Sequence, residues 1–171
     1  MVHMVHLKGG VIILTLLRSQ DADDEFLFEI YASSRLDEFA NLGWPEQELN
    51  RFLRMQYEMQ KISYQARYPD ACYEIVADQG RRVGRMLTAN TEEAVVLVDV
   101  ALLPLARGQG IGSLLIRELQ RKAASANKPI RLNVLADNPA RRLYARLGFR
   151  ETGHQFPYIA MEWNSNGVDT A

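Results

Sequence analysis

The chain alternates between short aliphatic runs and longer segments in which apolar residues recur at helical spacing. The short runs are rich in β-branched and aliphatic side chains, which predicts strands. They cover residues 11–18, 72–77, 82–87, 93–103, 130–135, 149–153 and 158–163. Segments of helical spacing cover residues 21–35, 45–68, a stretch ending near 127, and 138–147. We therefore expect an α/β protein with a mixed, mostly antiparallel sheet of about seven strands flanked by about four helices.

Local turn and capping signals separate these elements. Asp78-Gln79-Gly80 predicts a hairpin turn between two strands. Pro45 suits the first turn of the second helix, and Asn138-Pro139 suits the start of the last helix. Gly148 is placed to end that helix.

The organisation along the chain predicts one domain. The 171 residues contain no internal repeat and no low-complexity linker. We expect the domain to cover residues 11–164, preceded by a disordered extension at 1–10 and followed by a polar tail at 165–171. The apolar run at 11–17 is too short to span a bilayer, and no cleavage pattern follows it. We therefore expect a cytoplasmic protein with no membrane partner.

Charge and cysteine content exclude several classes of partner. Twenty basic and twenty-one acidic residues leave a net charge of −1, which gives no electrostatic case for binding nucleic acid. Cys72 is the only cysteine in the sequence, so neither a disulfide framework nor a cysteine-rich metal site is available. We expect no metal, and we expect Cys72 to be a small buried side chain.

A glycine-rich segment, Arg107-Gly108-Gln109-Gly110-Ile111-Gly112, lies between a predicted strand and a predicted helix. Backbone N–H groups and the positive end of a helix at such a turn suit a phosphate or a pyrophosphate. The loop of nucleotide hydrolases requires Gly-Lys-Ser/Thr, and no lysine is present here. A dinucleotide fingerprint would place Ser113 where glycine is needed. The glycines could alternatively serve only close helix–sheet packing.

Two further motifs accompany this loop. Arg107, Gly110 and Gly112 fill the pattern Arg-x-x-Gly-x-Gly, and the strand VDVALLP precedes it. The later segment NPARRLYARLGF follows at residues 138–149. Together the motifs resemble the GNAT superfamily of acyl-CoA-dependent N-acyltransferases, over roughly residues 72 to 163. The resemblance implies the GNAT fold, acetyl-CoA as the acyl donor and an amine as the acceptor.

The resemblance also implies a role for individual residues. Arg107 would add charge beside the pyrophosphate, and Asn138 would hydrogen-bond the cofactor or an ordered water. The strand residues would pair their backbone with the pantetheine arm, and a backbone N–H near Leu102 would meet the thioester oxygen. These strand residues are Val100, Ala101 and Leu102. The residues that would hold the pyrophosphate are Gly108, Gln109, Gly110, Ile111, Gly112 and Ser113.

The catalytic groups carry open alternatives. Tyr144 would protonate the departing sulfur, or it is a half-buried core residue. Some GNAT enzymes carry a glutamate where this chain has Asn133, so Asp99 is the remaining candidate for the base. A carboxylate in that apolar strand is expected to be desolvated, but it could also only satisfy backbone groups. Asn138 stands six residues before Tyr144, one fewer than is usual in many members, so Asp137 could take its place.

We therefore expect an acetyl-CoA-dependent N-acetyltransferase that acts on a primary amine of a small molecule or a protein. The alternative is a coenzyme A-binding sensor or assembly module without catalysis. A homodimer is expected from the family. His154 is expected at the surface. Aromatic and methionine residues would line an acceptor pocket or form core; these are Trp44, Met55, Tyr57, Met59, Tyr64 and Tyr68.

Overall fold

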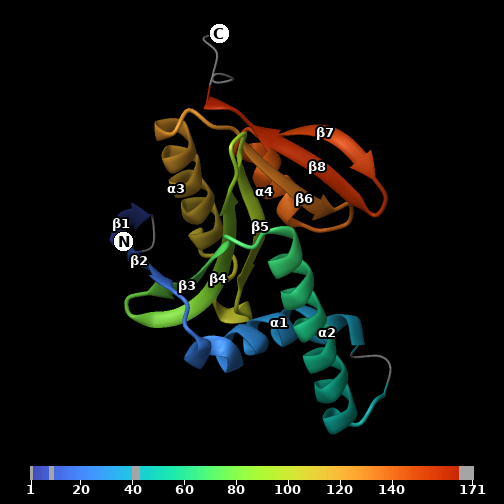
Figure 1. Cartoon of the computed structure of the whole chain (residues 1–171). Coiled ribbons are helices and arrows are strands. Elements are labelled where there is room, and N and C mark those ends of the chain that lie inside the picture. Colours follow the sequence, from blue (N-terminus) through green and yellow to red (C-terminus); the bar gives the residue numbers. More distant parts are fainter. Residues whose placement is uncertain (1, 8–9, 40–42, 166–171) are drawn as a thin grey trace. The chain divides into compact units, whose positions relative to one another are not determined.

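The computed structural model of the chain describes residues 2–7, 10–39 and 43–165. Helices and strands follow one another in the expected order, with one additional strand at the start of the chain (Figure 1). The chain forms two compact units. The first comprises Met1–Leu87 and Asp99–Gly108, and the second comprises Thr88–Val98 and Gln109–Ala171.

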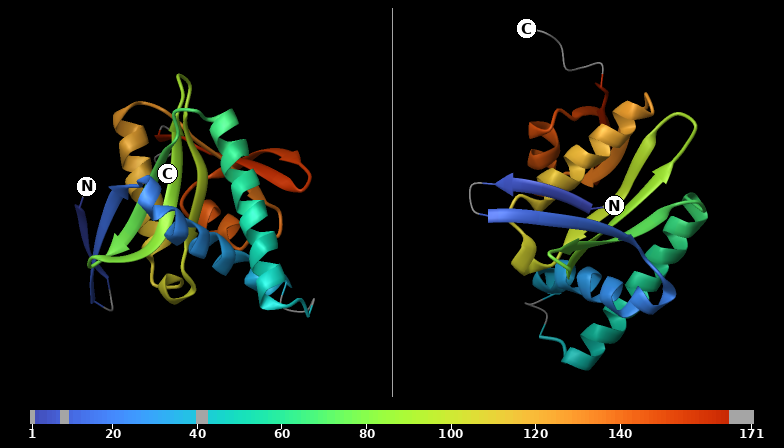
Figure 2. Two further views of the ribbon diagram at one scale, coloured as in Figure 1. Left: turned by 60° about the horizontal axis from the view of Figure 1, so that its bottom comes forward. Right: turned by 90° about the vertical axis from the view of Figure 1, so that its left-hand side faces the viewer.

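The first unit contains strands in the order β1-β2-β3-β4-β5 and two long helices (Figures 1 and 2). Its elements are β1 (Val2–Leu7), β2 (Gly10–Arg18), the 3-10 helix η1 (Asp21–Asp23), α1 (Asp24–Phe39), α2 (Glu46–Arg67) and β3 (Cys72–Asp78). The start of β4 (Arg81–Asn90), the end of β5 (Val95–Leu102) and the 3-10 helix η3 (Pro104–Ala106) complete it. Strand β1 lies within the segment that the sequence had suggested was a disordered extension. It pairs antiparallel with β2, from Val2↔Thr15 to Leu7↔Gly10.

The hairpin that joins β3 to β4 confirms the predicted turn. Strand β3 ends at Asp78 and β4 begins at Arg81, and the residues between them are Gln79 and Gly80. Gln79 has φ of 48° and Gly80 has φ of 80°. Positive φ at both central residues gives the turn a twist that matches the twist of paired strands, and glycine adopts it without steric cost.

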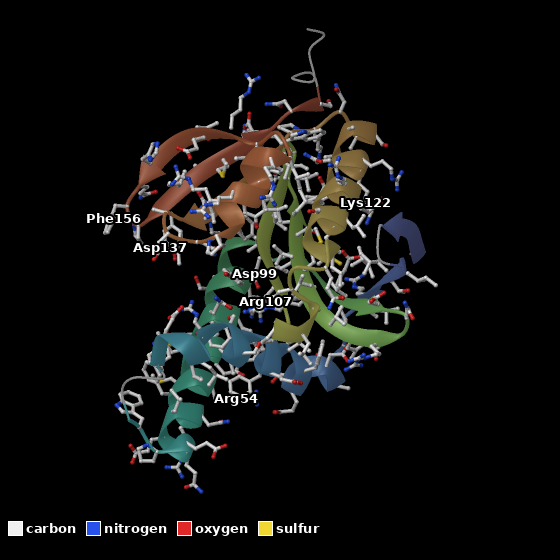
Figure 3. The ribbon with its side chains drawn as sticks, turned by 180° about the vertical axis from the view of Figure 1, so that it is seen from behind. Arg54, Asp99, Arg107, Lys122, Asp137 and Phe156 are labelled. Atoms are coloured by element: carbon white, nitrogen blue, oxygen red, sulfur yellow. The ribbon has the colours of Figure 1, made fainter. Side chains whose placement is uncertain are left out.

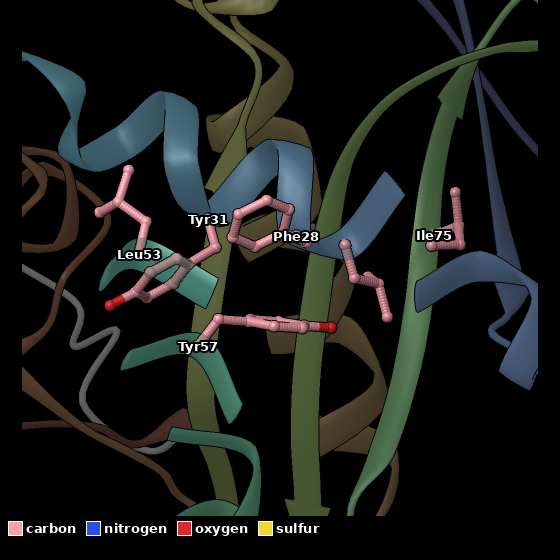
Figure 4. Close-up of a cluster of buried hydrophobic side chains, with 6 residues drawn as sticks. Phe28, Tyr31, Leu53, Tyr57 and Ile75 are labelled. Atoms are coloured by element: carbon pink, nitrogen blue, oxygen red, sulfur yellow. The ribbon is translucent and has the colours of Figure 1, made fainter. Parts of the chain in front are cut away.

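Helices α1 and α2 pack on one face of β3 and bury the core of the first unit. The side chains of this cluster are Leu27, Phe28, Tyr31, Leu53, Tyr57 and Ile75 (Figure 4). The Tyr57 ring lies 5.7 Å from the ring of Phe28 and 5.6 Å from that of Tyr31, at tilted angles that favour aromatic contact. The cluster therefore fixes α1 against α2.

The apolar residues that recur at helical spacing along α2 are only partly buried. Leu53 and Tyr57 are buried, at 2% and 1% exposure. Met55, Met59 and Ile62 are instead exposed, at 52%, 62% and 69%. Residues at i and i+4 share a helix face, whereas these three follow a second stripe on the opposite side. The alternative that Met55 and Met59 form core is therefore wrong, and Ile62 lies on the same exposed side.

The second unit contains strands in the order β4-β5-β6-β8-β7 and two helices. Its further elements are α3 (Ile111–Ser125), β6 (Ile130–Leu135), α4 (Ala140–Arg146), β7 (Arg150–Gln155) and β8 (Tyr158–Trp163). Strand β6 pairs antiparallel with β8 along its whole length, and β7 pairs antiparallel with β8. Strands β5 and β6 are parallel, from Val95↔Ile130 to Leu97↔Leu132. The mixed, mostly antiparallel sheet is thus confirmed.

Alternation along β6 shows why this strand forms. Ile130, Leu132 and Val134 are buried, while Arg131 and Asn133 between them are exposed. This period of two places one apolar face against the core and one polar face toward water. On the polar face, Arg131 contacts Glu162 of β8 at 2.8 Å. Of the helices that the structure describes, none combines the length and apolar character needed to cross a membrane.

Candidate functional site

The glycine-rich loop follows β5 and η3 and leads directly into α3. Gly108 has φ of 73° and Gly110 has φ of 85°. A Cβ atom built on Gly108 would meet nothing within 4 Å, so this glycine is required by its left-handed backbone and leaves space above the main chain. Arg107, Gly108 and Gln109 are exposed. The backbone of the loop is thus accessible to a ligand.

The N-terminus of α3 suits an anion. Its N-cap residue is Gly110, which has no side chain to accept hydrogen bonds from the first turn, and that turn holds no acidic residue. Helix N-termini present unpaired N–H groups and partial positive charge. Gly112 lies inside the first turn, where a Cβ would lie 3.4 Å from Cδ2 of Leu143. The loop is exposed and the helix start is uncapped; that they bind a phosphate stays a prediction.

Arg107 contacts the strand that precedes the loop. Its Nε donates a hydrogen bond of 2.9 Å to the backbone oxygen of Leu102, the last residue of β5. Figure 3 shows Arg107 and Asp99 in the same region of the first unit. The guanidinium is exposed, so its remaining N–H groups can reach an anion at the loop.

The end of β5 lies very close to β4. A Cβ on Gly84 would lie 2.6 Å from the backbone oxygen of Ala101 and 2.5 Å from Cδ2 of Leu102. The backbone N–H of Leu103 donates to the oxygen of Val83 at 2.8 Å. Glycine at position 84 thus permits the approach of the strand that was predicted to hold the pantetheine arm.

Asp99 is not an isolated carboxylate. Its Oδ2 accepts a hydrogen bond of 2.8 Å from Nε of Arg85 on β4 and lies 2.8 Å from Nη2 of the same guanidinium. The Asp99 side chain is 22% exposed, whereas that of Arg85 is 4% exposed. The expectation of a carboxylate surrounded by apolar groups therefore changes: a guanidinium faces it. Sequence reasoning missed Arg85. A signal was present, because Arg85 is the only charged residue in the run VGRML, just as Asp99 is the only charged residue in the aliphatic run of the next strand.

Asn138 and Tyr144 belong to the second unit. Asn138 lies just before α4, and Tyr144 lies within it. Tyr144 is 6% exposed, and its ring lies 5.6 Å from that of Phe149. The Oδ1 atom of Asn138 accepts a hydrogen bond of 2.9 Å from the N–H of Ala140, so this side chain caps the start of α4. Asp137 beside it is exposed (Figure 3). Tyr144 therefore packs within its unit, and Asn138 has a structural partner.

The other candidates divide between core and surface. Tyr57 is buried and donates a hydrogen bond of 3.0 Å to Asp24, so it does not line an open pocket. Trp44 is 43% exposed and stacks edge-on against Phe52 at 5.3 Å. Cys72 is a free thiol that is half-buried, less than expected. His154 is exposed, as expected, with its Nε2 3.4 Å from Glu151.

No group of three or more His, Cys, Asp or Glu side chains that could hold a metal ion occurs in the described ranges. At the turn between β7 and β8, Phe156 is 96% exposed and points away from the strands (Figure 3).

Comparison with known proteins identifies a family domain within the chain. Residues 69–151 match the acetyltransferase (GNAT) domain family, and this segment contains β3 to α4 with the glycine-rich loop. These residues form a GNAT acetyltransferase domain. The resemblance seen in the sequence is thereby confirmed. A search of curated proteins finds no match to this chain.

Solved structures share the GNAT fold at low identity. The PaiA N-acetyltransferase from Thermoplasma acidophilum, in complex with coenzyme A, is 18% identical, with a TM-score of 0.68 over 88% of this chain and 98% of that one. PH1933 from Pyrococcus horikoshii OT3 is 18% identical, with a TM-score of 0.67 over 91% and 99%. A SpeG spermidine N-acetyltransferase chimera from Vibrio cholerae and hSSAT is 20% identical, with a TM-score of 0.59 over 90% and 96%. The fold expectation is confirmed.

Proposed function

We propose that this GNAT protein is an N-acetyltransferase that transfers an acetyl group from acetyl-CoA to a primary amine of a small molecule or a protein. The observation that carries the proposal is the exposed glycine loop that runs into the uncapped N-terminus of α3, within residues matched to the GNAT domain family. The coenzyme A in the complex of the PaiA relative supports the same cofactor class. A cytoplasmic location and a homodimer stay predictions.

In this proposal the loop binds the cofactor through its backbone. The N–H groups from Gln109 to Ser113 hold the pyrophosphate, and Arg107 adds a charge-assisted contact. The backbone of β5 at Val100, Ala101 and Leu102 pairs with the pantetheine arm. Because main-chain atoms do this work, aliphatic side chains suffice at these strand positions.

The proposed reaction is direct attack by the amine. Asp99 accepts a proton from the acceptor ammonium, and the free amine then forms the C–N bond with the thioester carbon. A backbone N–H near Leu102 stabilises the oxyanion of the tetrahedral intermediate, and the C–S bond breaks when this intermediate collapses. Tyr144 gives a proton to the departing thiolate and regains one from solvent. The second proton of the nitrogen and the proton held by Asp99 also leave to solvent. No covalent enzyme intermediate is required, so Cys72 takes no part.

A second candidate is a coenzyme A-binding sensor or assembly module. It is favoured by Asn133, which stands exposed on β6 where some GNAT enzymes carry a glutamate. It is favoured also by the engagement of Asp99 with Arg85. Such a protein would bind acetyl-CoA without turning it over.

One experiment separates the two functions. The full chain is incubated with acetyl-CoA and a panel of alkylamines, polyamines, amino acids and peptides, and free thiol and acetylated product are measured by absorbance and mass spectrometry. The enzyme predicts stoichiometric thiol and N-acetylated product with at least one amine. Binding of acetyl-CoA without thiol release from any amine would instead support the sensor.

A further inference from the structure

A charged side chain of β4 lies almost completely inside the first unit. Arg85 is 3% exposed, and its guanidinium is surrounded by acceptors. Nε donates to Oδ2 of Asp99 at 2.8 Å, and Nη2 forms an ion pair with the same oxygen at 2.8 Å. Nη1 donates to the backbone oxygen of Leu27 on α1 at 3.3 Å, and Nη2 donates to Oε1 of Gln60 on α2 at 3.3 Å. The guanidinium is therefore fixed by β5, α1 and α2 together.

Stability alone does not explain this arrangement. Removing an arginine and a carboxylate from water costs several kcal/mol per ion, and apolar side chains of similar volume are often as stable or more so. The pair is also unequal, because the Asp99 carboxylate is several times more exposed than the guanidinium that holds it. A buried cation thus supports a carboxylate that solvent, and a ligand, can reach.

The groups around the pair leave Arg85 as the cation in contact with Asp99. Tyr73 of β3 faces the same region, and burial is the largest cause that raises its pKa, so it is neutral at physiological pH. Lys61 of α2 interacts electrostatically with Tyr73, but its Nζ lies 2.6 Å from Asp24. Gln60 is uncharged. Nε and Nη2 of Arg85 both lie 2.8 Å from a single oxygen, Oδ2, so the guanidinium holds the position of that oxygen.

We infer that Arg85 is a positioning residue, which orients the Asp99 carboxylate toward the acceptor amine. The inference rests on the proposed function, in which Asp99 is the proton acceptor. Arg85 itself contacts neither the amine nor the thioester. Its charge and its fixed N–H groups make separate contributions, since lysine would supply charge without the paired geometry.

The test uses kcat and KM of the wild-type protein and five variants, with the best amine of the panel. Arg85→Gln removes the charge and the fork of N–H donors, so we expect a loss of about 10- to 100-fold in kcat. Arg85→Lys keeps the charge, so kcat should fall by a smaller factor. The KM for acetyl-CoA should not change in either variant.

A double-mutant cycle separates positioning from folding. Asp99→Asn should abolish most turnover, and adding Arg85→Gln to it should lower kcat no further, because Arg85 acts through Asp99. The matched control is Arg82→Gln on the same strand, which breaks an arginine contact of 2.6 Å with the largely buried Asp23. We expect it to lower the melting temperature but to leave kcat nearly unchanged.

The outcomes are distinct. If the wild-type protein releases no thiol with any amine, the proposed function is refuted. If the wild-type protein turns over but the kcat losses of Arg85→Gln and Asp99→Asn multiply in the double variant, only the role of Arg85 is overturned. An unchanged kcat in Arg85→Gln would also overturn it. Should Arg85→Gln fail to fold, Arg85→Lys decides through the same cycle with Asp99→Asn.

Discussion

Among single residues, Tyr144 carries the most specific chemical expectation. In the proposed reaction its hydroxyl protonates the thiolate, so Tyr144→Phe should lower kcat by about 100-fold, in the usual range for loss of a general acid. The ring packs against Phe149, and phenylalanine keeps this contact, so the fold should persist. Turnover assays measure kcat, and a thermal shift with acetyl-CoA shows whether the fold persists. Unchanged kcat would remove Tyr144 from the mechanism.

A second residue-scale prediction concerns Asp24 at the start of α1. Partial burial raises the pKa of Asp24, but hydrogen bonds from Lys61 and Tyr57 and the charges of Lys61 and Arg54 lower it on balance below the ordinary 3.8. A carboxyl whose pKa is depressed on folding stabilises the protein above the unfolded pKa, and this contribution is lost as the pH falls through the folded pKa. Asp24→Asn should remove that part of the acid sensitivity.

Urea unfolding between about pH 2 and pH 6 measures this effect. The free energies of unfolding of wild-type and Asp24→Asn proteins should differ most above pH 4 and converge in acid. Curves that stay parallel over the whole range would contradict the assignment. Glu25 offers a control, since its side chain contacts the same Arg54 but is 83% exposed, and Glu25→Gln should change little.

Single residues also show where sequence reasoning reaches its limit. Asp99 could be selected because a lone carboxylate in an aliphatic strand is conspicuous, and Gly108 and Gly110 could be selected from the motif. Arg85 could not be paired with Asp99, because their partnership depends on which strands are neighbours and in what register. Side-chain roles set by neighbouring strands require the fold.

At the scale of elements, the contact between β4 and β5 depends on Gly84. An alanine Cβ there would overlap the backbone oxygen of Ala101 and the side chain of Leu102. Because a backbone atom cannot move aside cheaply, Gly84→Ala should destabilise the protein by about 1–3 kcal/mol. It should also weaken acetyl-CoA binding, since the shifted residues belong to the strand proposed to pair with pantetheine.

The matched control is Gly153→Ala on β7, where the new Cβ would lie 3.8 Å from Cβ of Ala160, an ordinary contact. We expect a change within about 0.5 kcal/mol. Denaturant unfolding of the two variants compares the sites directly. Equal stability of Gly84→Ala and wild-type protein would show that β5 can shift without cost.

Element boundaries followed well from local patterns, while helix faces did not. The strand β6 was predicted as 130–135 and forms as Ile130–Leu135, because turn and proline signals bound it on both sides. Helix α2 was also found at its expected place. Its apolar residues, however, occupy two faces, and composition does not say which of them meets β3. Met55, Met59 and Ile62 are exposed because they lie on the face that does not meet β3.

At the scale of the whole molecule, the order of elements and the GNAT assignment followed from motifs separated by about 30 residues. The pairing of β1 with β2 did not, because residues 1–10 were expected to form a disordered extension. The proposed function requires that the continuous loop from Arg107 to Ser113 binds a pyrophosphate through its backbone. Space above that backbone is the physical condition for binding.

The most direct test is a thermal shift with acetyl-CoA on wild-type protein, Gly108→Trp and Gly80→Trp. Both glycines have positive φ, at 73° and 80°, and neither would place a Cβ near another atom, so the two variants carry similar backbone strain. The account predicts that acetyl-CoA raises the melting temperature of wild-type protein and of Gly80→Trp, but not of Gly108→Trp. An equal shift in all three proteins would contradict the claim that this loop holds the cofactor.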